Sequence, residues 1–183
     1  MFAGTDEKRI WVQGEMLKLG LARAYAIDGS AHCLAELIQH EAIAREAAKG
    51  LWADMIYAVR STDEETALLR LAGTFQIVEG KVHRVSDVRG STYINFGEDW
   101  RQDFTVVMRA AVRRSLQEGA VQPADLEGRK VRVRGWIERR GGPMIEINHA
   151  AAIEVLAEEA EEAPSAPSPP ARRRSRQRPS PPR

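Results

Sequence analysis

The spacing of apolar residues along the chain changes once, close to Gly73. Before this glycine, apolar side chains recur every three or four residues, which is the period of an amphipathic helix. After it, apolar and polar residues alternate, which is the period of a half-buried strand. The pattern therefore predicts an α+β protein in which helices come first and a sheet follows them.

Two helices are predicted in the first part. One covers Trp11–Leu21 and ends at Gly20, and the other covers Glu36–Lys49 and ends at Gly50. Glycine is favoured at both ends because it adopts the left-handed conformation that closes a helix. Two helices within roughly 45 residues cannot bury both of their apolar stripes. We therefore expect a further surface to cover them, on a partner chain or in a self-associated form.

The second part predicts a five-stranded OB-type barrel. A helix at Arg109–Glu118 follows the third strand, as in the OB fold, and a last apolar strand lies near Ile153–Leu156. Turns are predicted at Arg89-Gly90 and at Gly141-Gly142. We expect the long first strand to bend at Gly80 so that it serves both sides of the barrel. The five strands are Thr74–Val88, Thr92–Phe96, Phe104–Met108, Lys130–Arg139 and Met144–Asn148.

The fourth strand supplies the candidate binding residues. Its alternation places apolar side chains on one face of the sheet and a basic, aromatic set on the other. Three cations and one aromatic ring on one face could neutralise phosphates and stack a base of single-stranded DNA or RNA. The alternative is an ordinary solvated strand face. The candidate nucleic-acid-binding residues are Lys130, Arg132, Arg134 and Trp136, together with Tyr93 on the second strand.

Two stretches in the helical part resemble the C-terminal helices of the thermonuclease (staphylococcal-nuclease-like) family. They read W-V-Q-G-E-M-L-K-L-G-L-A-R-A-Y from Trp11 and E-A-I-A-R-E-A-A-K-G-L-W from Glu41, and the resemblance covers about residues 8–54. It implies helices that pack on a barrel, and calcium-dependent cleavage of nucleic acid by groups that lie upstream of the first helix. None of those groups is matched here, so calcium is implied only for the complete family domain.

No catalytic residue is carried over from this resemblance, and we expect no calcium-dependent nuclease activity from this chain. Glu15 is expected to face solvent, and Glu41 to form a hydrogen bond between its helix and the core. The run G-R-K-V-R-V-R-G-W from Gly128 also resembles nucleic-acid-binding OB domains. The sequence thus favours a nucleic-acid-binding OB module without the catalytic half. A nuclease truncated at its N-terminus and a protein-interaction module remain as alternatives.

Composition adds little to this division. The net charge is +1, and the chain has one cysteine, which leaves the redox compartment open. Neither a signal peptide nor a membrane-spanning run is visible, and the cellular compartment is not determined. The acidic loop Gly97–Asp103 could hold a hard cation, but a turn stapled by an Arg–Asp pair is the commoner arrangement. No metal site and no cofactor is assigned.

The predicted domains follow from these patterns. They are a helical remnant of a thermonuclease-like domain at 1–54, a helical connector at 55–72, the OB domain at 73–156 and a Pro/Arg-rich tail at 157–183. The tail is predicted to be disordered because its composition offers no core. Its arginines could strengthen contact with an anionic partner, or the tail could act only as a solubilising segment.

Overall fold

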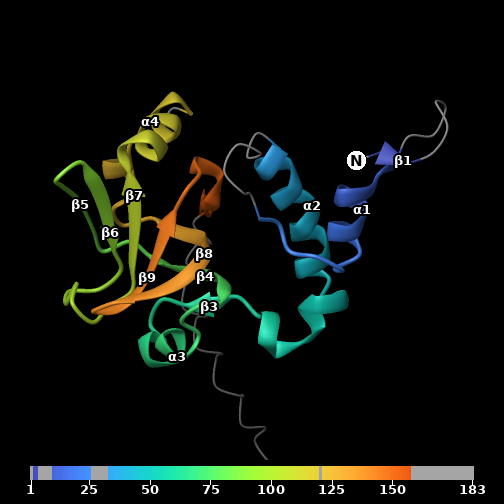
Figure 1. Ribbon diagram of the computed structural model, residues 1–183, viewed down its shortest axis with the longest axis horizontal. Helices are drawn as coiled ribbons and strands as arrows, with labels where there is room; N and C mark the ends of the chain where they lie inside the picture. The colour runs from blue at the N-terminus through green and yellow to red at the C-terminus, as the bar shows by residue number, and fades with distance from the viewer. Residues whose placement is uncertain (1, 4–9, 26–32, 120, 158–183) are drawn as a thin grey trace, which may run out of the picture.

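The computed structural model describes residues 2–3, 10–25, 33–119 and 121–157. The predicted disordered tail therefore lies, apart from its first residue, outside the described residues. Figure 1 shows a strongly curved mixed sheet on one side of the molecule and the helices α1 and α2 on the other. The predicted α+β class, with helices first and strands second, agrees with this architecture.

The helical region consists of a short two-stranded pair, two α-helices that pack on each other, and two 3-10 turns. A two-stranded pair, β1 (Phe2–Ala3) and β2 (Ile10–Trp11), precedes α1 (Val12–Lys18), and α2 (Leu34–Glu46) follows. Both α-helices end earlier than the sequence pattern predicts. Two 3-10 turns then lead toward the sheet, η2 (Gly50–Ala53) and η3 (Met55–Tyr57).

Two glycines allow the ends of α1 and α2 to touch. Gly20 and Gly50 both have positive φ angles, 70° and 58°. A Cβ on Gly20 would lie 2.2 Å from the carbonyl oxygen of Lys49, so no larger residue fits there without moving the backbone. The amide of Leu51 donates to the carbonyl of Gly20 at 2.8 Å. The glycines that carry the predicted helix ends thus also form the contact between the two helices.

A short strand in the connector was not predicted from the sequence. β3 (Arg60–Ser61) pairs in parallel with the first long strand, and α3 (Glu65–Arg70) follows it, where the sequence predicts a short helix. The side chain of Thr62 lies against Gly80, where a Cβ would be 2.0 Å from the threonine Oγ1. Gly80 is therefore required by this close contact. The expectation that it marks the bend of the first strand is wrong.

The predicted strands all form, with small shifts of their ends. The long first strand is divided at Val82 and His83, so the bend lies two residues after Gly80. The strands are β4 (Phe75–Lys81), β5 (Arg84–Val88), β6 (Ser91–Asn95), β7 (Thr105–Arg109), β8 (Lys130–Arg140), β9 (Gly142–Ile147) and β10 (Ile153–Val155). The helix α4 (Ala110–Glu118) and the turns η4 (Pro123–Leu126) and η5 (Ala150–Ala152) complete the fold.

The strand order in the large sheet is β3-β4-β8-β9-β7-β6-β5, and β10 pairs with β8. When the short strand β3 is set aside, the strands at the two ends of this ladder are β4 and β5, which are consecutive in the chain and separated only by Val82 and His83. If they are counted as one bent strand, the pairing from β4 to β9 is that of the OB fold: antiparallel, except for the parallel pair β7–β9. The short strand β3 is added in parallel at the edge of β4. The sheet is thus OB-like, with α4 between its third and fourth strands.

One hydrophobic core fills the inside of this sheet, and two smaller clusters join the helices to its outside. Ala44 and Trp52 of the helical region pack with Ile77 of β4, and a separate cluster around Leu17 and Ile38 reaches Ala151. The surface that covers Leu17, Ile38 and Trp52 belongs to this chain, so the expectation that it lies on a partner chain or in a self-associated form is wrong for these residues. Alternation predicts that one face of a strand is buried, but it does not show what covers the other face.

Candidate ligand-binding face of the sheet

The outward face of the sheet carries a row of side chains that crosses six strands, β4, β8, β9, β7, β6 and β5. Phe75 lies opposite Trp136, Glu146 opposite Val107, Val107 opposite Tyr93, and Tyr93 opposite Ser86. The pairing of Ile137 with Ile145 places Trp136 next to Glu146 in the same register. Two of the predicted binding residues, Tyr93 and Trp136, therefore share one face of the sheet, as the alternation indicates.

The helices cover one half of this face. Arg23 donates to the carbonyl of Phe75 at 3.0 Å, and its guanidinium lies 5.0 Å from the Phe75 ring centroid. Burial lowers the pKa of Arg23, and the carboxylate of Glu41 partly offsets this effect. Trp52, from the second thermonuclease-like stretch, packs on Ile77. The residues that carry the family resemblance are thus the ones that contact the sheet.

Arg134, one of the predicted binding residues, is buried under these helices and does not lie on an exposed strand face. Only 3% of the residue is exposed. Its Nη1 donates to both carboxylate oxygens of Glu41, at 3.1 and 3.2 Å, and its Nη2 donates to Glu154 at 2.9 Å. Glu41 is fully buried and also accepts from the amide of Ala24 at 2.6 Å and from Arg45 at 2.9 Å. The predicted core hydrogen bond of Glu41 is therefore confirmed.

Arg132 is likewise committed to neighbouring strands. It is half-buried and lies between Glu79 on β4 and Glu154 on β10, which are its direct partners in the ladder. Its Nε donates to Glu79 at 2.6 Å, and its Nη1 lies 3.7 Å from Glu154. Lys130 is half-buried at the end of the same strand, opposite Lys81. The basic stripe read from the sequence is thus largely part of the fold's own ion-pair network.

The uncovered half of the face contains an aromatic groove. Figure 1 shows β5 and β6 on the side of the sheet farthest from α1 and α2. The groove has a volume of about 470 Å³ and more apolar than polar surface. None of its described lining residues is acidic. They are Arg84, Ser86 and Val88 on β5, Tyr93 and Asn95 on β6, and Trp100 from the loop that follows β6.

Tyr93 is the groove residue that the sequence predicted, and Trp100 is the exposed aromatic ring of the groove that it did not. Trp100 is 60% exposed, and the guanidinium of Arg101 lies 4.6 Å from its ring centroid. The acidic side chains of this loop hold its backbone. Asp99 accepts from the amide of Arg101 at 3.1 Å, and Asp103 accepts from the amide of Asp99 at 2.7 Å. The loop is thus stapled through its own backbone amides, and an exposed tryptophan at the tip of a stapled turn is the signal that could have revealed it.

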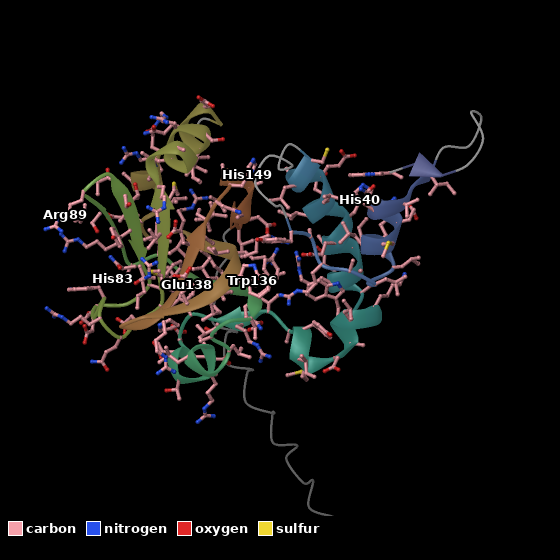
Figure 2. The ribbon with its side chains drawn as sticks, in the orientation of Figure 1. His40, His83, Arg89, Trp136, Glu138 and His149 are labelled. Atoms are coloured by element: carbon pink, nitrogen blue, oxygen red, sulfur yellow. The ribbon has the colours of Figure 1, made fainter. Side chains whose placement is uncertain are left out.

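A second depression, which we call the acidic pocket, lies where the helical region meets the sheet. Its volume is about 270 Å³, and its walls include Tyr25, Trp136, Glu138 and Glu146. Figure 2 shows Trp136 and Glu138 along β8, with Trp136 nearer to the helices. The rings of Tyr25 and Trp136 are almost perpendicular, at 87°, with their centroids 6.4 Å apart. Trp136 is 50% exposed, so one wall of this pocket is an accessible indole.

The exposed side of the helical region is rich in apolar side chains. Met16, Leu19, Leu21 and Ile43 are all exposed. Glu15 faces solvent, as predicted, and forms a 2.8 Å pair with Lys18. The expectation that these helices contact a protein partner or self-associate is not tested by the structure and stays a prediction. No helix within the described residues is both long and apolar enough to cross a membrane.

Comparison with known proteins adds no family. No family model matches the chain, and no curated protein matches it. The thermonuclease resemblance therefore gains no support here and stays a prediction.

Solved structures that are similar to this chain include an OBody bound to hen egg-white lysozyme, with 19% identity and a TM-score of 0.38 over 54% of this chain and 92% of that one. The Stn1-Ten1 complex of S. pombe has 16% identity and a TM-score of 0.33 over 45% of this chain and 57% of that one. Asparaginyl-tRNA synthetase from Pyrococcus horikoshii has 15% identity and a TM-score of 0.37 over 55% of this chain and 23% of that one. At these values the likenesses carry no argument about function.

Proposed function

We propose that the chain is a nucleic-acid-binding module, and that single-stranded nucleic acid lies along the aromatic groove between β5, β6 and Trp100. The observation that carries the proposal is the presence of two rings on one groove, the exposed Trp100 and the half-buried Tyr93. Bases of any sequence stack on such rings, because every base has a π face.

The position of the groove on the fold supports the same function. With β4 and β5 counted as the first strand, β6 and β7 are the second and third. OB folds bind oligonucleotides on the face of these two strands and at the loops that join the first to the second and the fourth to the fifth strand. Trp100 extends this face from the loop between the second and third strands. Tyr93 and Asn95 lie on β6, on the outward side. The described half of this face that the helices leave uncovered is thus the half that an OB fold uses.

Charge supplies the second part of the argument. Arg84 lines the groove and Arg101 lies over Trp100, so a strand stacked on the rings would pass two guanidinium groups. Contacts of this kind bind the backbone without reading the sequence. Arg132 and Arg134 are left out of this set because their guanidinium groups are already paired with Glu79, Glu41 and Glu154. We expect weak base preference and a marked salt dependence.

The test is fluorescence anisotropy with an end-labelled oligothymidine across a salt series. Trp100→Ala should weaken binding by about 1–3 kcal/mol without changing the salt slope, because stacking releases no counterions. Arg84→Ala should reduce that slope by about 0.7, the value for one phosphate contact on a single strand. Arg70→Ala, an exposed arginine on α3, is the matched control and should bind as the wild type does. Absence of binding at low salt, or a Trp100→Ala protein that binds normally, would show that the groove does not bind nucleic acid.

A further inference from the structure

The acidic pocket differs from the groove in the charge of its walls. Trp136 and Glu146 lie side by side in the register, and Glu138 lies two residues further along β8 on the same face. Diagonal neighbours of this kind are close enough for their side chains to reach one ligand. Arg134 also lines this pocket, but its guanidinium is paired with Glu41 and Glu154. The two carboxylates beside the indole repel phosphates and attract cations, so this pocket is less suited to the ligand proposed for the groove.

The aromatic walls have the geometry that favours an organic cation. Tyr25 and Trp136 present two perpendicular rings, and Phe75 packs edge-on behind both, at 5.2 and 6.1 Å between centroids. A guanidinium or ammonium group is attracted to the face of an indole within about 6 Å of its centroid. Guanidinium also stacks flat on rings while it donates to a carboxylate in its own plane.

The present partners of the two carboxylates do not close the site. Arg109 donates to Glu146 through two nitrogens, and Arg140 lies 3.2 Å from Glu138. These two arginine side chains are 65% and 61% exposed. The pair of Arg140 with Glu138 is a surface pair of small net strength, whereas the two-nitrogen contact of Arg109 with Glu146 is the stronger of the two. An ionised carboxylate has about four acceptor positions and can accept from a second guanidinium.

We propose that the acidic pocket binds the guanidinium group of an arginine side chain, stacked on Trp136 and paired with Glu138 and Glu146. The volume of about 270 Å³ suits one side-chain head group and is smaller than the pockets that hold drug-sized molecules. Two sources of such a group exist. One is a separate basic peptide, and the other is the chain's own arginine-rich segment, Arg172–Arg178, since Ala152 of the pocket wall precedes that segment by 20 residues.

The experiment is an NMR titration of the full ¹⁵N-labelled chain with argininamide, following the indole N–H of Trp136. Citrullinamide is the matched probe, because it replaces the charged guanidinium by a neutral urea of the same shape. Argininamide should give a saturable shift at Trp136, and citrullinamide should give none. Glu146→Gln and Glu138→Gln should each weaken argininamide binding at least about fivefold, and Trp136→Leu about tenfold. Trp100→Ala, in the other depression, should leave it unchanged.

A second protein separates the two sources. It carries serine in place of the tail arginines Arg172, Arg173, Arg174, Arg176 and Arg178. If the tail occupies the pocket, this protein should bind argininamide more tightly than the wild type and should show a shifted Trp136 signal before any ligand is added. If the source is another molecule, the two proteins should bind equally. No saturable shift at Trp136 in either protein, or equal binding of citrullinamide, would overturn the proposal.

Discussion

The groove and the acidic pocket lie on the same outward face of one sheet, yet they are made from different parts of the chain. The groove uses β5, β6 and the following loop, all of them local in sequence. The pocket needs Tyr25 from the helical region beside residues of β8 and β9, so it exists only while the helices are docked. One depression is therefore a property of the sheet alone, and the other is a property of the assembled chain.

The groove and the acidic pocket also differ in the charged side chains that line them. The groove is lined by Arg84 and by no acidic residue, whereas the pocket is lined by two carboxylates and by Arg134, which is paired with Glu41 and Glu154. Both depressions have an exposed tryptophan. Aromatic exposure alone therefore does not define a ligand. The neighbouring charges decide whether an indole receives a base or a cation.

The largest effect is expected where the helices are held to the sheet. Glu41→Gln removes the charge that compensates Arg134 in a buried position, and breaking such a pair typically costs about 3–5 kcal/mol of unfolding free energy. Glu15→Gln removes the exposed pair with Lys18 and should cost less than about 1 kcal/mol. Urea unfolding of the two variants measures the difference. Equal stabilities would mean that the buried pair does not hold the two parts together.

A smaller effect is expected on oligonucleotide binding at the groove, from the negative charges of the acidic pocket on the same face of the sheet. The double variant Glu138→Gln/Glu146→Gln removes two negative charges from the face that binds the oligonucleotide, and affinity at low salt should rise about two- to fourfold. The same charge change on α2, Glu36→Gln/Glu46→Gln, is the control and should have less effect, because those side chains are exposed on the helical region. Anisotropy at low and high salt tests this, and a gain that persists at high salt would contradict an electrostatic origin.

The smallest effect concerns β5, the strand that borders the groove. The pKa of Asp87 is lowered, first by the hydrogen bond from the Thr92 hydroxyl and then by Arg113. A depressed carboxyl pKa contributes stability above the pKa of the unfolded chain, and this stability is lost as the pH falls through the folded value. Thr92→Val should raise the pKa of Asp87 toward its ordinary value and make the acid limb of stability shallower. Carbon-detected NMR of the Asp87 carboxyl measures the shift, and an unchanged titration would contradict the assignment.

Much of the fold follows from periodicity, and the site follows only in part. The register of β8 is given by its alternation, since Val131, Val133 and Ile137 are all buried in the core. The burial of Arg134 cannot be predicted from the same alternation. A strand pattern carries no information on the helix, 93 residues earlier, that supplies Glu41. The exposure of Trp100 cannot be predicted from the sequence for a different reason. It lies in an irregular loop, where no period exists to show which way a side chain points.

The ion pair between Glu41 and Arg134 also has a consequence for the timing of folding during synthesis. The two residues are separated by 93 positions, so α2 leaves the ribosome well before its partner strand is made. At a synthesis rate of about 5–20 residues per second, the carboxylate waits about 5–20 s for its guanidinium. During that interval the helical region has neither its charge partner nor its covering sheet, and a chaperone or a second nascent chain has its longest access to those apolar side chains.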